Sequence, residues 1–234
     1  SKAWWAAYGA LALLGVAGFA ASQSRGPLVG LFVGIVAFAL FYGISSKERR
    51  DRIVAASLVG AGILGYGALY LARGTEIVQR LRLDRFVDFS STASTRLIAW
   101  KIAWQSFLER PLFGWGLDAF HIVFNTHYNP VSLRFSLYET WFDRAHNTVL
   151  DVLAMTGVLG FLTYAAIFAV LFWSVYRAYK KGWLDHAFAS ILIGLPVAYF
   201  VQNLFVFDHP AGFVLSYLMF GLVIAATRPG FLAG

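Results

Sequence analysis

Long apolar runs are the feature that most restricts the fold of this chain. A helix needs about 20 predominantly apolar residues to cross a bilayer. Runs of roughly that length cover residues 4–21, 27–44, 53–71, 158–176, 187–207 and 213–226. Backbone polar groups inside hydrocarbon must be satisfied within the segment, so such runs fold as helices. The sequence predicts an all-α polytopic membrane protein with about six transmembrane helices.

Composition supports the same fold class. Hydrophobic residues make up 59% of the chain and charged residues 13%, whereas soluble domains carry roughly 25% charge. Aromatic residues reach 18%, as expected for a protein with many anchors at the membrane surface. The chain has no cysteine, which excludes disulfides, thiol nucleophiles and Cys-ligated metals.

Three parts follow one another along the chain. Residues 1–73 hold three predicted spans, 74–145 form a mixed amphipathic segment, and 146–234 hold a short helix, broken at Gly157, followed by three spans. In the middle part, Ser94 or Thr95 is expected to cap a helix that continues to about Glu109. Its apolar side suits a helix that lies in the membrane interface.

Lysine and arginine in the short loops set the orientation. Basic residues cluster in two of these loops, and such clusters mark the cytoplasmic side. They are Lys47, Arg49, Arg50 and Arg52 in one loop and Arg177, Lys180 and Lys181 in the other. The middle segment then lies on the opposite, outer face. Since the basic residues are divided between two membrane faces, we expect no nucleic-acid partner.

Small residues indicate where helices pack. Gly30 and Gly34 form a small-xxx-small pair, which is typical of a close helix contact. Four further glycines, Gly60, Gly62, Gly65 and Gly67, lie in the third run. The chain opens with Ser1-Lys2 and enters a span at once. We therefore expect further N-terminal transmembrane helices, or another chain, to pack against this unit.

His146 is the first candidate for chemistry. It lies in Arg144-Ala145-His146-Asn147, directly before a long apolar run. Titratable groups at that depth are costly unless they are used. His146 could act as a general base toward a hydroxyl, with Asp143, Arg144 and Asn147 in support. The structural alternative is a helix start in which His146 and Asn147 only satisfy backbone donors.

Arg25 and Arg96 are candidates for binding an anion. Arg25 lies at a span end between Ser24 and Gly26 on the outer side, where a flanking arginine is not preferred. The alternative is a membrane anchor whose charged end reaches water. Arg96 is expected in the first turn of its helix, where the free N–H groups favour anions. Arginine pairs with phosphate through two parallel hydrogen bonds.

Several chemistries find no support in the sequence. It lacks an HExxH motif, a glycine-rich phosphate loop and a carboxylate cluster for a divalent cation. We expect no metal and no cofactor. Asp118, after the Gly-Trp-Gly turn, is expected to cap a helix.

Three stretches carry a family resemblance. They are Ser24-Arg25-Gly26, Pro111-Leu112-Phe113-Gly114-Trp115-Gly116, and Ala145-His146-Asn147 with Leu150, Gly157 and Gly160. In this order and spacing the chain resembles the O-antigen ligase and O-antigen polymerase superfamily of bacterial inner-membrane glycosyltransferases. Members usually have ten or more spans, so the chain resembles their C-terminal half.

The resemblance implies a metal-independent enzyme with its active site on the periplasmic side, where the middle segment would lie. The donor would be a glycan on undecaprenyl diphosphate. The acceptor would be lipid A-core in a ligase, our first interpretation, or another lipid-linked glycan in a polymerase. By match to the motifs, Arg25 and Arg96 would bind the diphosphate and His146 would activate the acceptor hydroxyl. A transporter of an anionic lipid-linked substrate is the alternative, and a structural subunit is the third.

Overall fold

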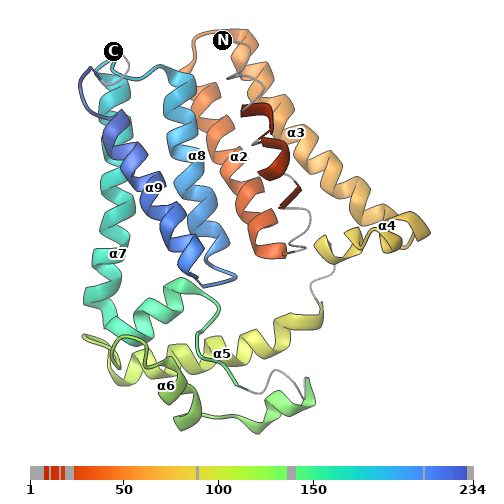
Figure 1. Ribbon diagram of the computed structural model, residues 1–234, viewed down its shortest axis with the longest axis vertical. Helices are drawn as coiled ribbons and strands as arrows, with labels where there is room; N and C mark the ends of the chain where they lie inside the picture. Colours follow the sequence, from red (N-terminus) through yellow and green to blue (C-terminus); the bar gives the residue numbers. More distant parts are fainter. Residues whose placement is uncertain are drawn as a thin grey trace.

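The chain folds into helices throughout the part that the structure describes. The computed structural model describes residues 8–10, 12–15, 17–18, 24–87, 90–135, 141–207 and 209–230, without the side chains of 90–93. The labelled elements are α2 (Arg25–Ser45), α3 (Arg49–Ala72), α4 (Glu76–Arg80), η1 (Leu83–Phe86), α5 (Ser90–Glu109), α6 (Phe120–Thr126), η2 (Pro130–Arg134), α7 (Thr148–Lys180), α8 (His186–Gln202) and α9 (Pro210–Ala226) (Figure 1). The predicted all-α fold is confirmed.

Three described helices are long and apolar enough to cross a membrane, namely α2, α3 and α7. Helices α8 and α9 are apolar but shorter, at 17 residues each. At about 1.5 Å per residue they reach roughly 26 Å, close to the thickness of the hydrocarbon core. The first predicted span, 4–21, lies largely outside the described residues. The count of six spans therefore stays a prediction.

Close packing of α2 on α8 depends on glycine. A Cβ added at Gly30 would lie 2.6 Å from the carbonyl oxygen of Ala198, and one at Gly34 would lie 2.6 Å from the Ala198 Cβ. A Cβ added at Gly194 on α8 would lie 2.9 Å from the Gly34 carbonyl oxygen. The predicted packing role of the Gly30–Gly34 pair is confirmed. On α3, Gly62 faces Phe32 of α2, whereas Gly60, Gly65 and Gly67 have open space beside them.

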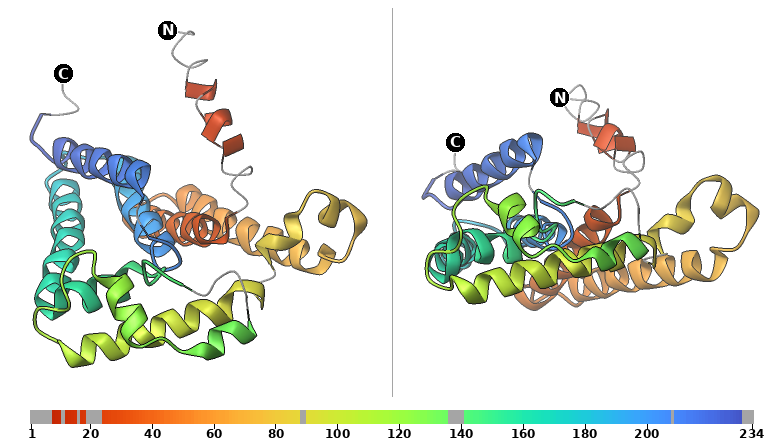
Figure 2. Two further views of the ribbon diagram at one scale, coloured as in Figure 1. Left: turned by 60° about the horizontal axis from the view of Figure 1, so that its bottom comes forward. Right: turned by 90° about the horizontal axis from the view of Figure 1, so that it is seen from below.

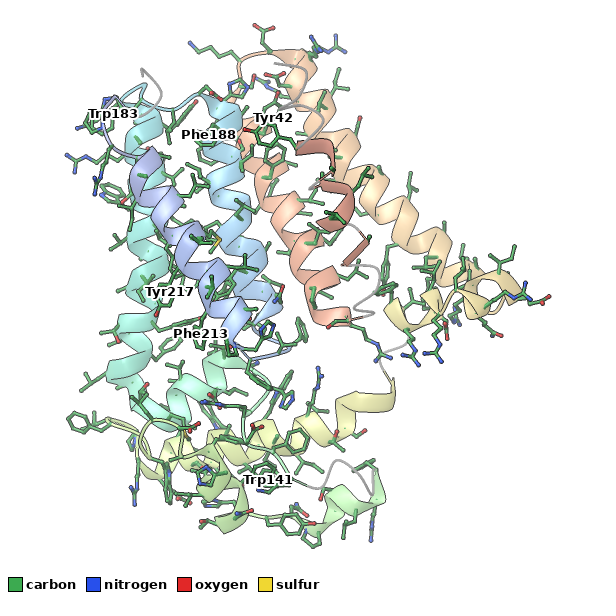
Figure 3. All side chains as sticks on the ribbon, viewed as in Figure 1. Tyr42, Trp141, Trp183, Phe188, Phe213 and Tyr217 are labelled. Atoms are coloured by element: carbon green, nitrogen blue, oxygen red, sulfur yellow. The ribbon has the colours of Figure 1, made fainter. Side chains whose placement is uncertain are left out.

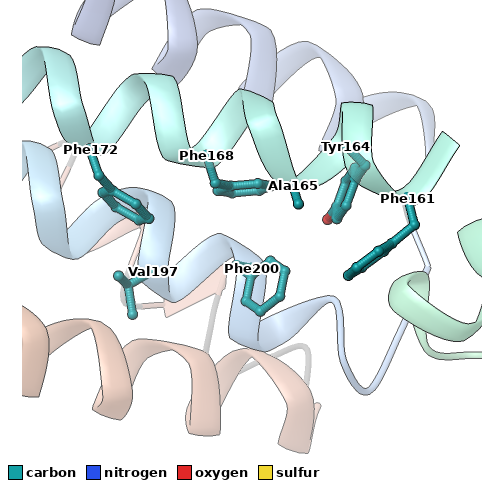
Figure 4. Close-up of a pocket in the computed structure, with 7 residues that line it drawn as sticks. All are labelled: Phe161, Tyr164, Ala165, Phe168, Phe172, Val197 and Phe200. Atoms are coloured by element: carbon teal, nitrogen blue, oxygen red, sulfur yellow. The ribbon is translucent and has the colours of Figure 1, made fainter. Parts of the chain in front are cut away.

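Aromatic side chains join α7, α8 and α9. The ring of Phe168 on α7 makes edge contacts with Phe200 of α8 at 5.2 Å and Phe220 of α9 at 6.0 Å. A cavity of about 230 Å³ lies between α7 and α8 beside these rings, also lined by Phe161 and Tyr164 (Figure 4). Offset and edge-to-face aromatic contacts add to apolar burial, so these rings stabilise the packing of α7 on α8 and α9 beside the cavity.

Helix α7 breaks at Gly157. The residue has φ 65° and ψ −168°, which only glycine adopts easily. The piece before the break runs across the end of the bundle, and the piece after it runs along the bundle (Figure 1). The predicted short helix and separate span are therefore present, although the short helix begins at Thr148 and not at His146.

The 111–116 loop replaces the hydrogen bonds that the break removes. In a continuous helix the carbonyls of Ala154 and Met155 would accept from residues four positions later. Here the loop donates to those carbonyls, and its own carbonyls accept from the N–H groups of the next helical piece. The bonds are Trp115 N to Ala154 O, Gly116 N to Met155 O, Val158 N to Pro111 O and Leu159 N to Leu112 O, at 2.8–3.4 Å. The Pro-Leu-Phe-Gly-Trp-Gly motif thus has a structural role.

Helix α5 lies across one end of the bundle, beneath α7, α8 and α2 (Figure 2). Its buried face includes Thr95, Ala99 and Ile102, while Leu97 and Trp104 are exposed. An apolar exposed side agrees with an interfacial position. The predicted cap at Ser94 or Thr95 is wrong, because the helix begins at Ser90. The polar Ser/Thr run resembled a cap but continues as helix.

The basic loops lie together at the opposite end from α5. The α2–α3 loop and the α7–α8 loop occupy the same end of the bundle (Figure 1). Tyr42, Trp183 and Phe188 lie near these loops, whereas Trp141 lies in the layer at the α5 end (Figure 3). Aromatic residues at both ends of an apolar bundle are typical of the two membrane–water interfaces.

Candidate functional site

The segment 203–207 joins α8 to α9 at the α5 end of the bundle (Figure 1). It is not helical. Its first residue, Asn203, is 1% exposed, and its carbonyl oxygen accepts a hydrogen bond from the Thr148 N–H at 2.8 Å. The segment is thereby tied to the first residue of α7.

Arg96 contacts this segment from α5. Its Nη1 donates to the carbonyl oxygen of Phe205 at 2.9 Å, and the residue is partly buried. Because α5 begins at Ser90, Arg96 is not in the first helical turn. The argument that free N–H groups of this turn favour an anion beside Arg96 is therefore wrong.

Arg25 reaches the same region from α2, of which it is the first residue. Its Nε donates to the carbonyl oxygen of Arg85 at 2.6 Å, which fixes the orientation of the guanidinium. The adjacent Gly26 packs on the segment, since a Cβ there would lie 3.3 Å from the Phe205 Cβ. Arg25, not Arg96, thus lies at a helix N-terminus, where N–H groups and the helix dipole favour anions.

His146 contacts the last residue of the segment, Phe207. Its ring meets the Phe207 ring edge-on at 4.9 Å and the Phe142 ring at 5.2 Å. Its backbone has φ 53°, in the left-handed region that few residues other than glycine adopt, although Asn, Asp and His do so more often than the others. The imidazole therefore packs on two aromatic rings while its backbone is in an uncommon conformation.

The Nδ1 atom of His146 lies 3.2 Å from the Arg144 carbonyl oxygen. A carbonyl oxygen only accepts, so in this contact Nδ1 carries the proton. In the neutral ring, the lone pair is then on Nε2. That tautomer is the one in which Nε2 can take a proton as a base.

The three residues predicted to support His146 have different roles. Asn147 caps α7, since its side chain accepts from the Leu150 N–H at 3.1 Å. Arg144 pairs with two carboxylates, Asp118 at 2.7 Å and Asp151 at 3.5 Å. Asp143 is exposed and makes none of the hydrogen bonds or ion pairs found in the described part of the chain.

Two acidic residues that contact the loop before His146 were missed or misplaced by sequence reasoning. Asp151 holds the loop before His146, because its Oδ1 accepts from the Ala145 N–H at 3.1 Å. A carboxylate inside an apolar run was the signal that could have identified it. Asp118 does not cap α6, whose N-cap is Ala119 without a side-chain bond.

A second histidine stabilises the α5–α6 layer. His127 Nε2 lies 2.7 Å from Glu109 Oε1, and its Nδ1 lies 3.1 Å from the Val123 carbonyl oxygen. Burial lowers the pKa of His127, but the hydrogen bonds to Glu109 and Val123 raise it, and the net pKa is above its usual value. Both ring nitrogens can donate in the charged form.

The structure brings Arg25, Arg96 and His146 to one end of the bundle, where Arg96, His146 and Gly26, the neighbour of Arg25, pack on the 203–207 segment. Trp100, one turn beyond Arg96 on α5, is partly buried. We predict that the three side chains open into one shared cavity, with Trp100 in its apolar wall. Among the described residues, no group of three or more His, Asp and Glu side chains is placed to hold a metal ion.

Apolar helices that can cross a bilayer, with charged residues in the loops at both ends, define an integral membrane protein. A family model described as O-antigen ligase matches residues 10–165. The chain belongs to the O-antigen ligase family, a group of membrane enzymes of polysaccharide biosynthesis.

The chain is also similar to a curated protein. The chain is 26% identical over 167 residues to the teichuronic acid biosynthesis protein TuaE of Bacillus subtilis (strain 168). The match covers 69% of this chain and 32% of the relative. The chain thus spans about a third of the length of the curated relative that it matches.

Proposed function

We propose that this chain carries the reaction centre of a glycosyltransferase that moves a glycan from undecaprenyl diphosphate to an acceptor hydroxyl. Arg25 and Arg96 bind the diphosphate, and His146 activates the acceptor. The observation that carries the proposal is that Arg96 and His146 contact the 203–207 segment and that Gly26, the neighbour of Arg25, packs on it.

The chemistry follows from these positions. The two guanidinium groups hold the diphosphate leaving group and stabilise the charge that develops on it. Nε2 of His146 removes the proton as the acceptor oxygen attacks the anomeric carbon. The new glycosidic bond forms as the bond to the diphosphate breaks, in one displacement with inversion. No metal is required for either step.

A groove between α2 and α3 suits the lipid chain of the donor. Two apolar cavities of about 560 and 580 Å³ lie along this helix pair and share Ile63. The first extends to Leu28 and Phe86, next to Arg25 and to the Arg85 that it contacts. The residues of α2 that line the two cavities run from Leu28 to Ile44, so the groove extends along roughly 25 Å. We infer that a polyprenyl chain lies in this α2–α3 groove with its diphosphate at Arg25.

The membrane side follows from the basic loops. Lys47, Arg49, Arg177 and Lys180 lie at the end opposite to His146. Basic loops face the cytoplasm, so we place the site on the periplasmic side of the bacterial inner membrane.

The acceptor distinguishes the two family activities. A ligase would use lipid A-core, and a polymerase would use another lipid-linked glycan. Both reactions need the same diphosphate contacts and the same base. Supplying each acceptor in turn to one donor-loaded preparation distinguishes them, and we propose the ligase as the first candidate.

Further helices of the same protein complete the working unit in our proposal. The chain matches only 32% of TuaE, and Gly67 on α3 has open space beside it. Small residues allow another helix to approach closely. Glycan transfer by residues 1–234 alone, at the rate of the complete protein, would show that no further helices are needed.

Replacement of His146 by Ala tests the proposal. The complete protein in lipid vesicles, given an undecaprenyl-diphosphate glycan and an acceptor, should transfer the glycan and continue to do so in chelator. The H146A variant should lose transfer but still bind the donor. Unchanged transfer by H146A would contradict the proposal, and donor movement across the vesicle without transfer would support the transporter instead.

A further inference from the structure

Asp151 is a carboxylate in an unfavourable place. It lies in the first turn of α7, and its side chain is 14% exposed. Burying a carboxylate is costly unless hydrogen bonds or charges compensate. The helix N-terminus favours a negative group, but it does not explain why this carboxylate points back toward the preceding loop.

The contacts of Asp151 are all directed at the residues just before His146. Its Oδ1 accepts from the Ala145 N–H at 3.1 Å, and its Oδ2 lies 3.5 Å from Arg144 Nη1. Ala145 is fully buried. The Asp151 carboxylate therefore fixes the backbone of Ala145 and the side chain of Arg144, the two residues before His146.

Arg144 also connects these residues to a third segment. Its Nη2 lies 2.7 Å from Asp118 Oδ1. Asp118 follows the Gly114–Gly116 turn and has φ 61°, so its own backbone is held in the left-handed region. The chain Asp118–Arg144–Asp151 thus connects the 111–118 loop, the loop before His146 and the first turn of α7.

We propose that Asp151 is a positioning residue that holds the His146 imidazole toward the acceptor. This inference rests on the proposed function of His146. The left-handed backbone of His146 is unfavourable, and it persists only where neighbouring contacts fix it. Asp151 fixes the preceding peptide through Ala145, and Asn147 fixes the following one by capping α7. Asp151 itself does not take the acceptor proton.

Three variants of Asp151 test the role in the complete protein. D151A removes both contacts and should lower kcat about 100-fold, because a small misplacement of a catalytic group has an effect of that size. D151N keeps an acceptor for the Ala145 N–H but loses the charge facing Arg144, and should lose about 10-fold. D151E should recover part of the activity of D151A. The KM for the donor should stay within about 2-fold, because the arginines are untouched.

A double-mutant cycle separates positioning from general stability. If Asp151 acts through His146, adding D151A to H146A should change the residual rate by less than about 2-fold. T156A is the matched control, since the Thr156 hydroxyl, within the part of the chain that the structure describes, donates to Val152 O of its own helix, and it should leave kcat unchanged. Thermal melting of each variant shows that the protein is folded.

The outcomes distinguish the two claims. If H146A retains transfer, the proposed function fails. If H146A is inactive and folded D151A and D151N keep the wild-type kcat, only the positioning role fails. A further loss of about 100-fold when D151A is added to H146A would also overturn it, because Asp151 would then act independently of His146.

Discussion

The Nη1 atom of Arg96 lies 2.9 Å from the carbonyl oxygen of Phe205, a residue 109 positions later in the chain. This bond connects the α5 layer to the segment that Gly26 and His146 also contact. A guanidinium oriented in this way has a fixed direction before any substrate arrives. Such preorganisation is what a site for a developing negative charge requires.

Arg25→Lys and Arg96→Lys should each weaken donor binding as well as turnover. Lysine keeps the charge but loses the planar fork that pairs with phosphate through two bonds. Hydrogen bonds to charged groups contribute about 1.5–3 kcal/mol, so the dissociation constant of an isoprenyl diphosphate should rise roughly 10- to 100-fold. Titration calorimetry on the purified protein measures the change.

Arg134→Lys is the control for both variants. Arg134 is exposed in η2 and makes no ion pair within the described residues. Its replacement should leave donor binding unchanged. Equal donor affinity of wild type, R25K and R96K would exclude the diphosphate role of the two arginines.

Gly157→Ala should destabilise the protein by more than about 3 kcal/mol. The backbone at φ 65° and ψ −168° disfavours any side chain, and a Cβ there would collide with the Leu112 backbone. The bonds between the 111–116 loop and the α7 break would be lost with it. Thermal unfolding in detergent measures the loss as a lowered Tm.

Gly221→Ala in α9 provides the comparison. Gly221 is helical and has open space beside it, so alanine there should be neutral or raise stability by up to about 1 kcal/mol. A G157A protein that melts with the wild type would show that the break does not need glycine.

How much of the fold could be predicted from the sequence depends on how far apart in the chain the interacting residues are. The helices α2, α3 and α9 were predicted within a few residues, because apolar run length is a local property. The break at Gly157 was predicted for the same reason. The start of α5 was missed since serine and threonine favour caps but also tolerate helix when tertiary contacts support it.

The candidate site depends on contacts between residues far apart in the chain, and these contacts were not predicted. His146, Arg25 and Arg96 were identified as unusual residues, and they do gather at one end of the bundle. The 203–207 segment, around which they gather, was treated as the end of a span. Asp151 was not considered at all. Both act through contacts between loops and backbone atoms. The position of Asp151 in an apolar run marks it as unusual, but the local sequence does not predict which atoms it contacts.

Gly65→Phe should weaken donor binding by filling the α2–α3 groove. Gly65 lines this groove and has open space beside it, so the ring can enter without moving the backbone. The affinity for undecaprenyl diphosphate should fall at least about 10-fold, while that for inorganic diphosphate should not change. Competition binding with both ligands measures the difference.

Gly221→Phe is the matched control for the groove. It places the same ring in open space on α9 and should leave both affinities unchanged. If G65F and the wild type bind the lipid equally well, the polyprenyl chain lies elsewhere. Equal loss of both ligands in G65F would indicate misfolding, which thermal unfolding would detect.

The stability of the α5–α6 layer should depend on the charge of His127. Its folded pKa is raised, as the bonds to Glu109 and Val123 outweigh burial. A raised folded pKa means that the charged form binds better in the folded state. The stabilisation is then fully present below the unfolded pKa of about 6.5 and is lost as pH rises through the folded pKa. The Tm of the wild type should therefore fall between pH 6 and pH 8 more than that of His127→Gln.

Glu109→Gln should reduce the same pH dependence of the Tm, since it removes the carboxylate that favours the imidazolium. Parallel Tm curves for wild type and H127Q across this range would show that His127 does not titrate in the folded layer.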